Sequence, residues 1–140
     1  MAWRSRLLVI ANQTATSDEL HGFLAGRRAQ GPVDVTLLLA ADRTGAAAAE
    51  RAAARLAEAL TRMDDAGIAC VGAFADSDPF VAACETYHPD AYDEIVVSTL
   101  PSDASRWVAF NTPQRIQREL EELFVGQQTW FRELLHHPPV

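Results

Sequence analysis

Short runs of aliphatic and β-branched residues recur along this chain, and a segment with helical character follows each of them. The runs cover residues 6–11, 33–40, 68–74 and 95–99. A continuous apolar run of this length, bounded by polar turns, is typical of a strand that is buried on both faces. Strands that alternate with helices in this way need right-handed crossovers, which produce a parallel sheet. We therefore predict a single α/β domain.

Capping residues indicate where the intervening helices begin and end. Ser17 or Asp18 can cap a helix that runs up to the Gly31-Pro32 break. The predicted helices that follow cover 46–66, closed by Gly67; 79–87, capped from Asp76-Ser77-Asp78; and 112–124, opened by Asn111-Thr112-Pro113.

The last segment, residues 125–140, has two interpretations. Trp130, Phe131, Leu134 and Leu135 have the spacing of a short amphipathic helix, and the closing His136-His137-Pro138-Pro139 fits a helix end. A fifth strand around residues 125–131 is the alternative. The helical spacing favours the helix.

Length and charge limit the classes of function. With 140 residues the chain fits one domain over 1–140, with a core at 6–124 and a tail at 125–140. Its net charge of −7 argues against nucleic acid or an anionic membrane as the main partner, since both attract basic surfaces. The apolar run 7–11 is too short for a signal peptide or a membrane span, so we expect a cytoplasmic protein.

Motifs for catalysis or metal binding are not evident. Gly-x-Ser-x-Gly, Walker, HExxH and paired zinc motifs do not occur in the sequence. Asp76 and Asp78 are better explained as turn and capping residues than as cation ligands. Cys84 lies on a predicted helix with no base nearby in the sequence. We therefore predict no catalytic and no metal-binding residues.

Three stretches together resemble the universal stress protein family. They are the first strand and turn at 6–14, the segment Ala75-Asp76-Ser77-Asp78-Pro79, and the run at 90–98 into the fourth strand. The resemblance covers residues 6–124. It implies a Rossmann-like three-layer sandwich whose four or five parallel strands have the order 3-2-1-4, with helices on both faces. It also implies a homodimer, because members of the family often pair through the C-terminal edge.

Many members of that family bind ATP through a glycine motif, G-x2-G-x9-G, followed by Ser or Thr. On this chain the glycine positions fall on Ser98, Pro101 and Asn111, and Thr112 holds the hydroxyl position. Glycine lets backbone N–H groups approach phosphate oxygens, whereas proline removes a donor. The acidic residue that ends the first strand in the family is Asn12 here. These replacements predict weak or absent ATP binding.

A candidate site still follows from the fold, because ligands of parallel α/β sheets bind beyond the carboxyl ends of the strands. If a nucleotide, ATP or AMP, or another small phosphorylated ligand binds, it would meet one set of residues there: Asn12, Ala41, Ser98, Ser105, Arg106, Asn111 and Thr112. Helix capping is the competing role of Asn111 and Thr112, and Arg106 could instead hold its loop to the sheet.

Three functional hypotheses remain open. The first is a non-catalytic binding or regulatory module similar to universal stress proteins. The second is a nucleotide-binding protein with a remodelled phosphate site and slow ATP hydrolysis. The third is an enzyme that acts on another phosphorylated ligand at the same place. If no fifth strand covers the fourth, the sheet edge there is open, and this edge together with Trp130 and Phe131 favours a homodimer.

Overall fold

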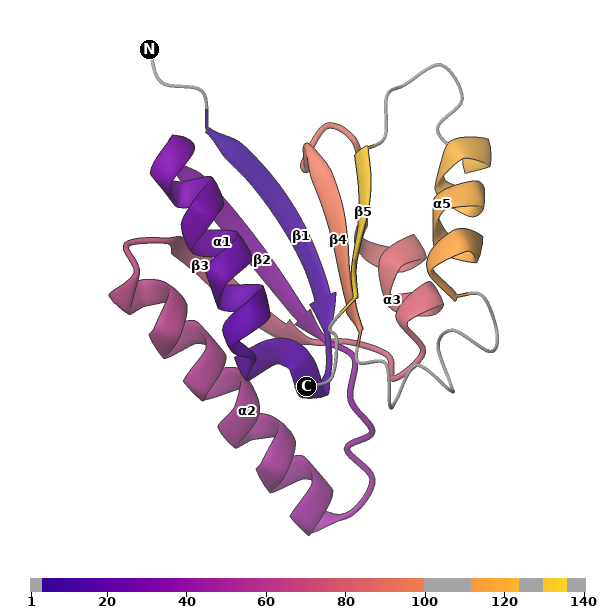
Figure 1. Ribbon diagram of the computed structural model, residues 1–140. Coiled ribbons are helices and arrows are strands. Elements are labelled where there is room, and N and C mark those ends of the chain that lie inside the picture. Colours follow the sequence, from indigo (N-terminus) through magenta and orange to yellow (C-terminus); the bar gives the residue numbers. More distant parts are fainter. Residues whose placement is uncertain (1–3, 100–111, 124–129, 136–140) are drawn as a thin grey trace.

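The computed structural model describes residues 4–99, 112–123 and 130–135. Strands and helices alternate along the chain from its first strand onward (Figure 1). The elements are β1 (Ser5–Ala11), the 3-10 helix η1 (Gln13–Thr16), α1 (Asp18–Gln30), β2 (Val33–Leu39), α2 (Ala46–Asp65), β3 (Ala69–Phe74), α3 (Pro79–Thr86), β4 (Glu94–Thr99), α5 (Thr112–Leu123) and β5 (Trp130–Leu135).

The strands form one five-stranded sheet in the order β3-β2-β1-β4-β5, and every neighbouring pair is parallel. The predicted α/β class and the order 3-2-1-4 are therefore confirmed. From β1 the chain builds outward to β2 and β3, and it then returns to place β4 on the other side of β1. The sheet thus has its switch point between β1 and β4, which is where ligands of such folds bind.

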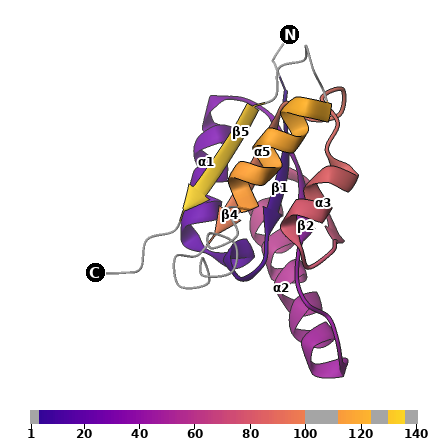
Figure 2. The ribbon, with the colours of Figure 1, turned by 90° about the vertical axis from the view of Figure 1, so that its right-hand side faces the viewer.

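Two separate hydrophobic clusters cover the two faces of the sheet. Leu7 and Val9 of β1 pack with α1 and α2, whereas the alternate residues Leu8 and Ile10 pack with α3 and α5. Figure 2 shows α3 and α5 on the face of the sheet that is opposite to α1. The molecule therefore has three layers, and this explains why the first apolar run is continuous: both faces of β1 are buried.

The predicted helix signals match the structure. The Ser17 hydroxyl accepts a hydrogen bond from the Leu20 N–H, and Asp78 caps α3 ahead of Pro79 in the same way. Gly67 follows α2 with a φ of 75°, and its N–H bonds back to the Asp64 carbonyl. A positive φ at this position is the reason that glycine ends the helix there.

The helix that we predicted for the tail is wrong, because residues 130–135 form strand β5. This strand pairs with β4 from Trp130, opposite Glu94, to Leu135, opposite Thr99. It also begins later than the alternative strand that we placed around residues 125–131. A segment of six residues is too short to sustain a helix of its own, and the open edge of β4 offers it a partner for its backbone. The edge of β4 is consequently covered.

A buried carboxylate links β5 to helix α1. Glu94 is 8% exposed and forms ion pairs with Arg27 of α1 at 2.8 Å and with Arg132 of β5 at 3.0 Å. Both guanidinium groups also lie over the Phe23 ring, at 5.1 and 5.3 Å from its centroid. The charge of Glu94 is thereby compensated twice, and β5 is tied to α1 as well as to β4.

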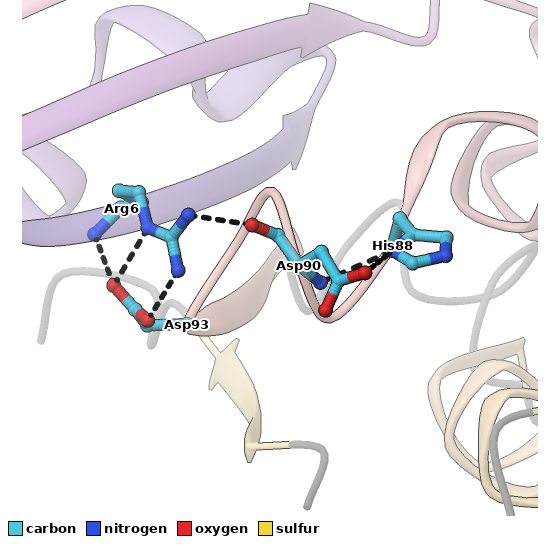
Figure 3. A network of polar contacts seen from close by, with 4 residues as sticks. All are labelled: Arg6, His88, Asp90 and Asp93. Atoms are coloured by element: carbon cyan, nitrogen blue, oxygen red, sulfur yellow. Dashed lines mark hydrogen bonds and ion pairs between the residues drawn. The ribbon is translucent and has the colours of Figure 1, made fainter. Parts of the chain in front are cut away.

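A second polar network joins the amino ends of β1 and β4 (Figure 3). The Arg6 guanidinium donates to both carboxylate oxygens of Asp93, and the backbone N–H groups of Arg6 and Asp93 bond across the same gap. Arg6 also donates to the Asp90 carbonyl, while His88 Nδ1 accepts from the Asp90 N–H. The network fixes the connection between α3 and β4, and it lies at the end of the sheet away from the switch point.

Candidate ligand-binding site at the carboxyl ends of β1 and β4

Two hydroxyl groups meet at the switch point of the sheet. Thr14 comes from η1, directly after β1, and Ser98 lies near the end of β4. Their oxygen atoms are 2.7 Å apart, and the Thr14 hydroxyl is also 3.2 Å from the Ser98 carbonyl oxygen. Both residues are buried, with exposed fractions of 2% and 1%. The two hydroxyls therefore bond to each other in a place from which water is excluded.

The directions of these hydrogen bonds follow from the carbonyl. A carbonyl oxygen can only accept, so the Thr14 hydroxyl donates its proton to the Ser98 backbone. The short bond between the two hydroxyls then takes its proton from Ser98. Ser98 thus uses its only side-chain proton to join β4 to η1. Its side chain acts as a structural link in this arrangement.

Asn12 has a charged partner that sequence reasoning missed. Arg55 of α2 donates to the Asn12 side-chain oxygen at 2.8 Å, in a partly buried position. Among the residues that the structure describes, no carboxylate forms an ion pair with Arg55. A guanidinium group carries several N–H donors, and an uncharged amide leaves its charge uncompensated. The end of β1 therefore has a positive charge beside it.

Ala41 lies next to these residues but offers little side-chain chemistry. It follows β2, where the Ala40 N–H bonds to the Ala11 carbonyl at 2.9 Å. The residue is 5% exposed and packs in the same cluster as Ala11 and Ala15. Ala41 therefore contributes packing at the end of β2, close to Asn12.

The remaining predicted site residues fall outside this description. Ser105, Arg106 and Asn111 lie outside the described residues, and so does the side chain of Thr112. The backbone of Thr112 opens α5, as expected from the sequence. The structure thus brings Asn12, Ala41 and Ser98 to one end of the sheet, adds Thr14 and Arg55 to them, and leaves the other four residues as predictions.

Other polar residues near the carboxyl ends serve local structure. Asp76 accepts from the Asp78 N–H, and Asp42 accepts from the Thr44 N–H in the same kind of turn. His21 donates from Nε2 to the Ala15 carbonyl at 2.8 Å. Within the described part of the chain, no three His, Cys, Asp or Glu side chains come together as a metal site would require.

The titratable groups near the core have pKa values that suit structural roles. Burial raises the pKa of the Cys70 and Cys84 thiols, so both remain protonated at neutral pH and are poor nucleophiles. Desolvation lowers the pKa of His21, although the Ala15 carbonyl opposes this shift. A neutral imidazole also agrees with its single donated hydrogen bond. Among the described residues, neither thiol is hydrogen-bonded to a side chain that could act as a base.

Comparison with known proteins adds no assignment: no protein-family model matches this chain, and no curated protein matches it significantly. None of the helices in the described ranges is long and apolar enough to cross a bilayer. The class that the structure establishes is therefore a parallel α/β fold of the Rossmann-like type.

Proposed function

We propose that this protein is a non-catalytic binding or regulatory module, similar to universal stress proteins, that binds ATP weakly or not at all. The observation that carries the proposal is the buried hydrogen bond between Thr14 and Ser98. It lies at the switch point, where a ligand of this fold would bind. Both hydroxyl protons are used in bonds between these two residues, which leaves neither available to a phosphate group.

Ser98 matters because it stands at the first glycine position of the family's ATP motif. A glycine leaves room for phosphate oxygens to approach the backbone. In this chain the side chain of Ser98 holds η1 against β4, and its carbonyl also accepts from Thr14. The side chain of Ser98 therefore occupies the position at which a glycine would leave room for phosphate oxygens beside the backbone.

A second candidate is a nucleotide-binding protein with a remodelled phosphate site and slow ATP hydrolysis, and Arg55 favours it. The guanidinium lies at the end of β1 with a neutral partner, Asn12. An anionic phosphate would supply the counter-charge that the amide lacks. In this version Arg55 would act with Asn12, Ala41 and Ser98, and with the four predicted residues that lie at or before the start of α5: Ser105, Arg106, Asn111 and Thr112.

Thermal unfolding with ATP, ADP and AMP, with and without magnesium, separates the two candidates. A ligand at about 100 times its dissociation constant stabilises the folded state by about 2.7 kcal/mol, whereas a ligand at its dissociation constant adds only about 0.4 kcal/mol. With ligand at about 1 mM, the first candidate predicts the small shift or none. A shift that matches the larger value would overturn it in favour of the second.

Two sets of variants test the site of the second candidate. Arg55→Ala should abolish any nucleotide-dependent shift, while Arg51→Ala, an exposed position one turn earlier on α2, should preserve it. Combined substitution of Arg106 and Thr112 by Ala tests the predicted loop and helix start. Binding that survives all of these changes would place the ligand elsewhere.

We further propose that the protein is a homodimer, as the resemblance implies. Strand β5 covers the edge of β4 from which this expectation was partly argued.

A further inference from the structure

Strand β3 forms an edge of the sheet that lacks the usual protection. It pairs with β2 and with no other strand in the described ranges (Figure 1). Its sequence, Ala-Cys-Val-Gly-Ala-Phe, contains no charged residue and no proline. Val71 is 63% exposed and Phe74 is 38% exposed. Natural edge strands normally carry charges, prolines or bulges that prevent pairing with another chain, so an apolar edge indicates a partner strand.

The direction of the free backbone groups can be derived from one hydrogen bond. The Ala75 N–H, just past the strand, donates to the Leu39 carbonyl of β2. The N–H and C=O groups of one residue point to the same side of a strand, and successive residues alternate. The backbone N–H and C=O groups of the odd-numbered residues of β3 therefore point toward β2. Cys70, Gly72 and Phe74 direct their backbone groups to the open edge.

The two faces of β3 differ in the same alternating way. Helix α2 covers the face of Cys70 and Gly72, where a Cβ added to Gly72 would lie 2.8 Å from a Leu56 methyl group. On the opposite face, Ala69, Val71 and Ala73 are exposed. The helices of that face, α3 and α5, pack mainly over β1 and β4. An added strand would therefore find one shielded face and one apolar, open face.

Opposite charges lie at the two ends of the α2 face of β3. The Arg43 guanidinium is 4.6 Å from the centroid of the Phe74 ring. At the other end, Asp64 is exposed in the last turn of α2, and its carbonyl accepts a hydrogen bond from the Gly67 N–H just before β3 begins. Neither charge forms an ion pair with another residue in the described part of the chain.

We propose that β3 pairs with β3 of a second copy of this chain, antiparallel, about a two-fold axis that passes beside Gly72. In this register the outward backbone groups of Cys70 bond to those of the partner's Phe74, and Gly72 bonds to the partner's Gly72. Val71 lies opposite the partner's Ala73 on the open face. Arg43 then meets the partner's Asp64, and the symmetry repeats the contact.

A second copy of the chain fits this edge because the two opposite charges, Arg43 and Asp64, lie at the two ends of the same strand. An antiparallel pair brings the Phe74 end of one β3 to the Cys70 end of the other, so each Arg43 meets an aspartate and not a second arginine. The opposite edge of the sheet is less suited to pairing, because Arg132 carries a half-exposed charge in the middle of β5. The two five-stranded sheets would thus join through β3 into one continuous sheet.

Charge reversal with sedimentation equilibrium tests this interface. Arg43→Glu and Asp64→Arg each replace two attractive contacts by two repulsive ones, so each variant should dissociate at least about tenfold more readily than the wild type. An equimolar mixture of the two variants should associate as tightly as the wild type, because every contact in the mixed dimer is again attractive. Arg118→Glu, on the exposed surface of α5, is the matched control and should leave association unchanged.

Amide hydrogen exchange gives an independent readout. In the dimer the N–H groups of Gly72 and Phe74 should be protected, and dilution to the monomer should release them. Restored association in the mixture also shows that the single variants fold.

The proposal is overturned by a wild type that is monomeric at high micromolar concentration, by a dimer that neither variant weakens, or by a mixture that fails to recover. Only the first of these results also removes the general proposal of a homodimer. None of them bears on nucleotide binding.

Discussion

Replacing the two hydroxyls at the switch point should show how much of the fold depends on their hydrogen bond. Ser98→Ala removes the 2.7 Å bond that the Ser98 hydroxyl donates, but the Thr14 hydroxyl keeps its own acceptor, the carbonyl of residue 98. A typical net contribution for one buried hydrogen bond is about 1 kcal/mol, so we expect a loss of about that size. Thr14→Val preserves shape but removes both bonds and leaves the buried Ser98 hydroxyl unpaired. We expect it to lose about 2–3 kcal/mol.

The double variant Thr14→Val with Ser98→Ala measures the coupling energy between the two hydroxyls. Once both hydroxyls are absent, neither can be left unsatisfied, so the double variant should lose about 1 kcal/mol less than the sum of the single losses. Urea denaturation followed by circular dichroism measures the three free energies of unfolding. Strictly additive losses would refute the hydrogen-bonded pair. In the case that the wild type binds nucleotide, a stable Ser98→Ala protein that has lost this binding would show that Ser98 contacts the ligand.

Further substitutions test other parts of the account. Gly67→Ala should lower the free energy of unfolding by about 1 kcal/mol, because the φ of 75° at this position is strained for alanine. Asparagine tolerates this conformation better, so Gly67→Asn should lose less in the same denaturation assay. Equal losses for the two variants would contradict the strain at this position. Burial raises the pKa of Asp93, but the hydrogen bonds and charge of Arg6 outweigh it and lower that pKa overall. The ionised form therefore stabilises the fold above the unfolded-state pKa of about 3.9, and this contribution is lost as the pH falls through the folded-state value. Wild-type stability should thus fall more steeply below about pH 4 than that of Asp93→Asn, and parallel pH profiles would contradict the pairing. The lowered pKa of His21 affects the stability in the same direction. The neutral imidazole stabilises the fold above about pH 6.5, and this contribution is lost as the pH falls through the lower folded-state pKa. His21→Gln should flatten the fall in stability as the pH drops below about 6.5, which thermal unfolding in matched buffers can measure.

The parts of the fold that depend on local chemistry could be predicted from the sequence. The continuous apolar run of β1 reflects burial on two faces, and that requirement appears directly in residue type. Ser17, Gly67 and Asp78 cap their helices through hydrogen bonds or backbone angles that involve only close neighbours in the chain. Such features need no knowledge of the distant parts of the molecule.

The features that were missed depend on contacts between distant segments. The strand conformation of β5 is stabilised by pairing with β4 and by the ion pair between Arg132 and Glu94, 38 residues apart in the sequence. Arg55 reaches Asn12 across a separation of 43 residues, from a helix whose sequence is mostly alanine and charged residues. Periodicity alone does not distinguish it from the other arginines of α2. Only the packing of α2 beside the end of β1 brings this charge to the candidate site.

We propose that the Thr14 and Ser98 hydroxyls at the switch point are satisfied by bonds between these two residues, and that the protein therefore binds nucleotide weakly at best. Isothermal titration calorimetry of ATP with magnesium into the wild-type protein tests it directly. We predict no measurable heat of binding, or a dissociation constant of about 1 mM or weaker, which corresponds to about −4 kcal/mol. A dissociation constant of about 10 μM or tighter, lost in Arg55→Ala, would contradict it and establish the protein as a nucleotide binder.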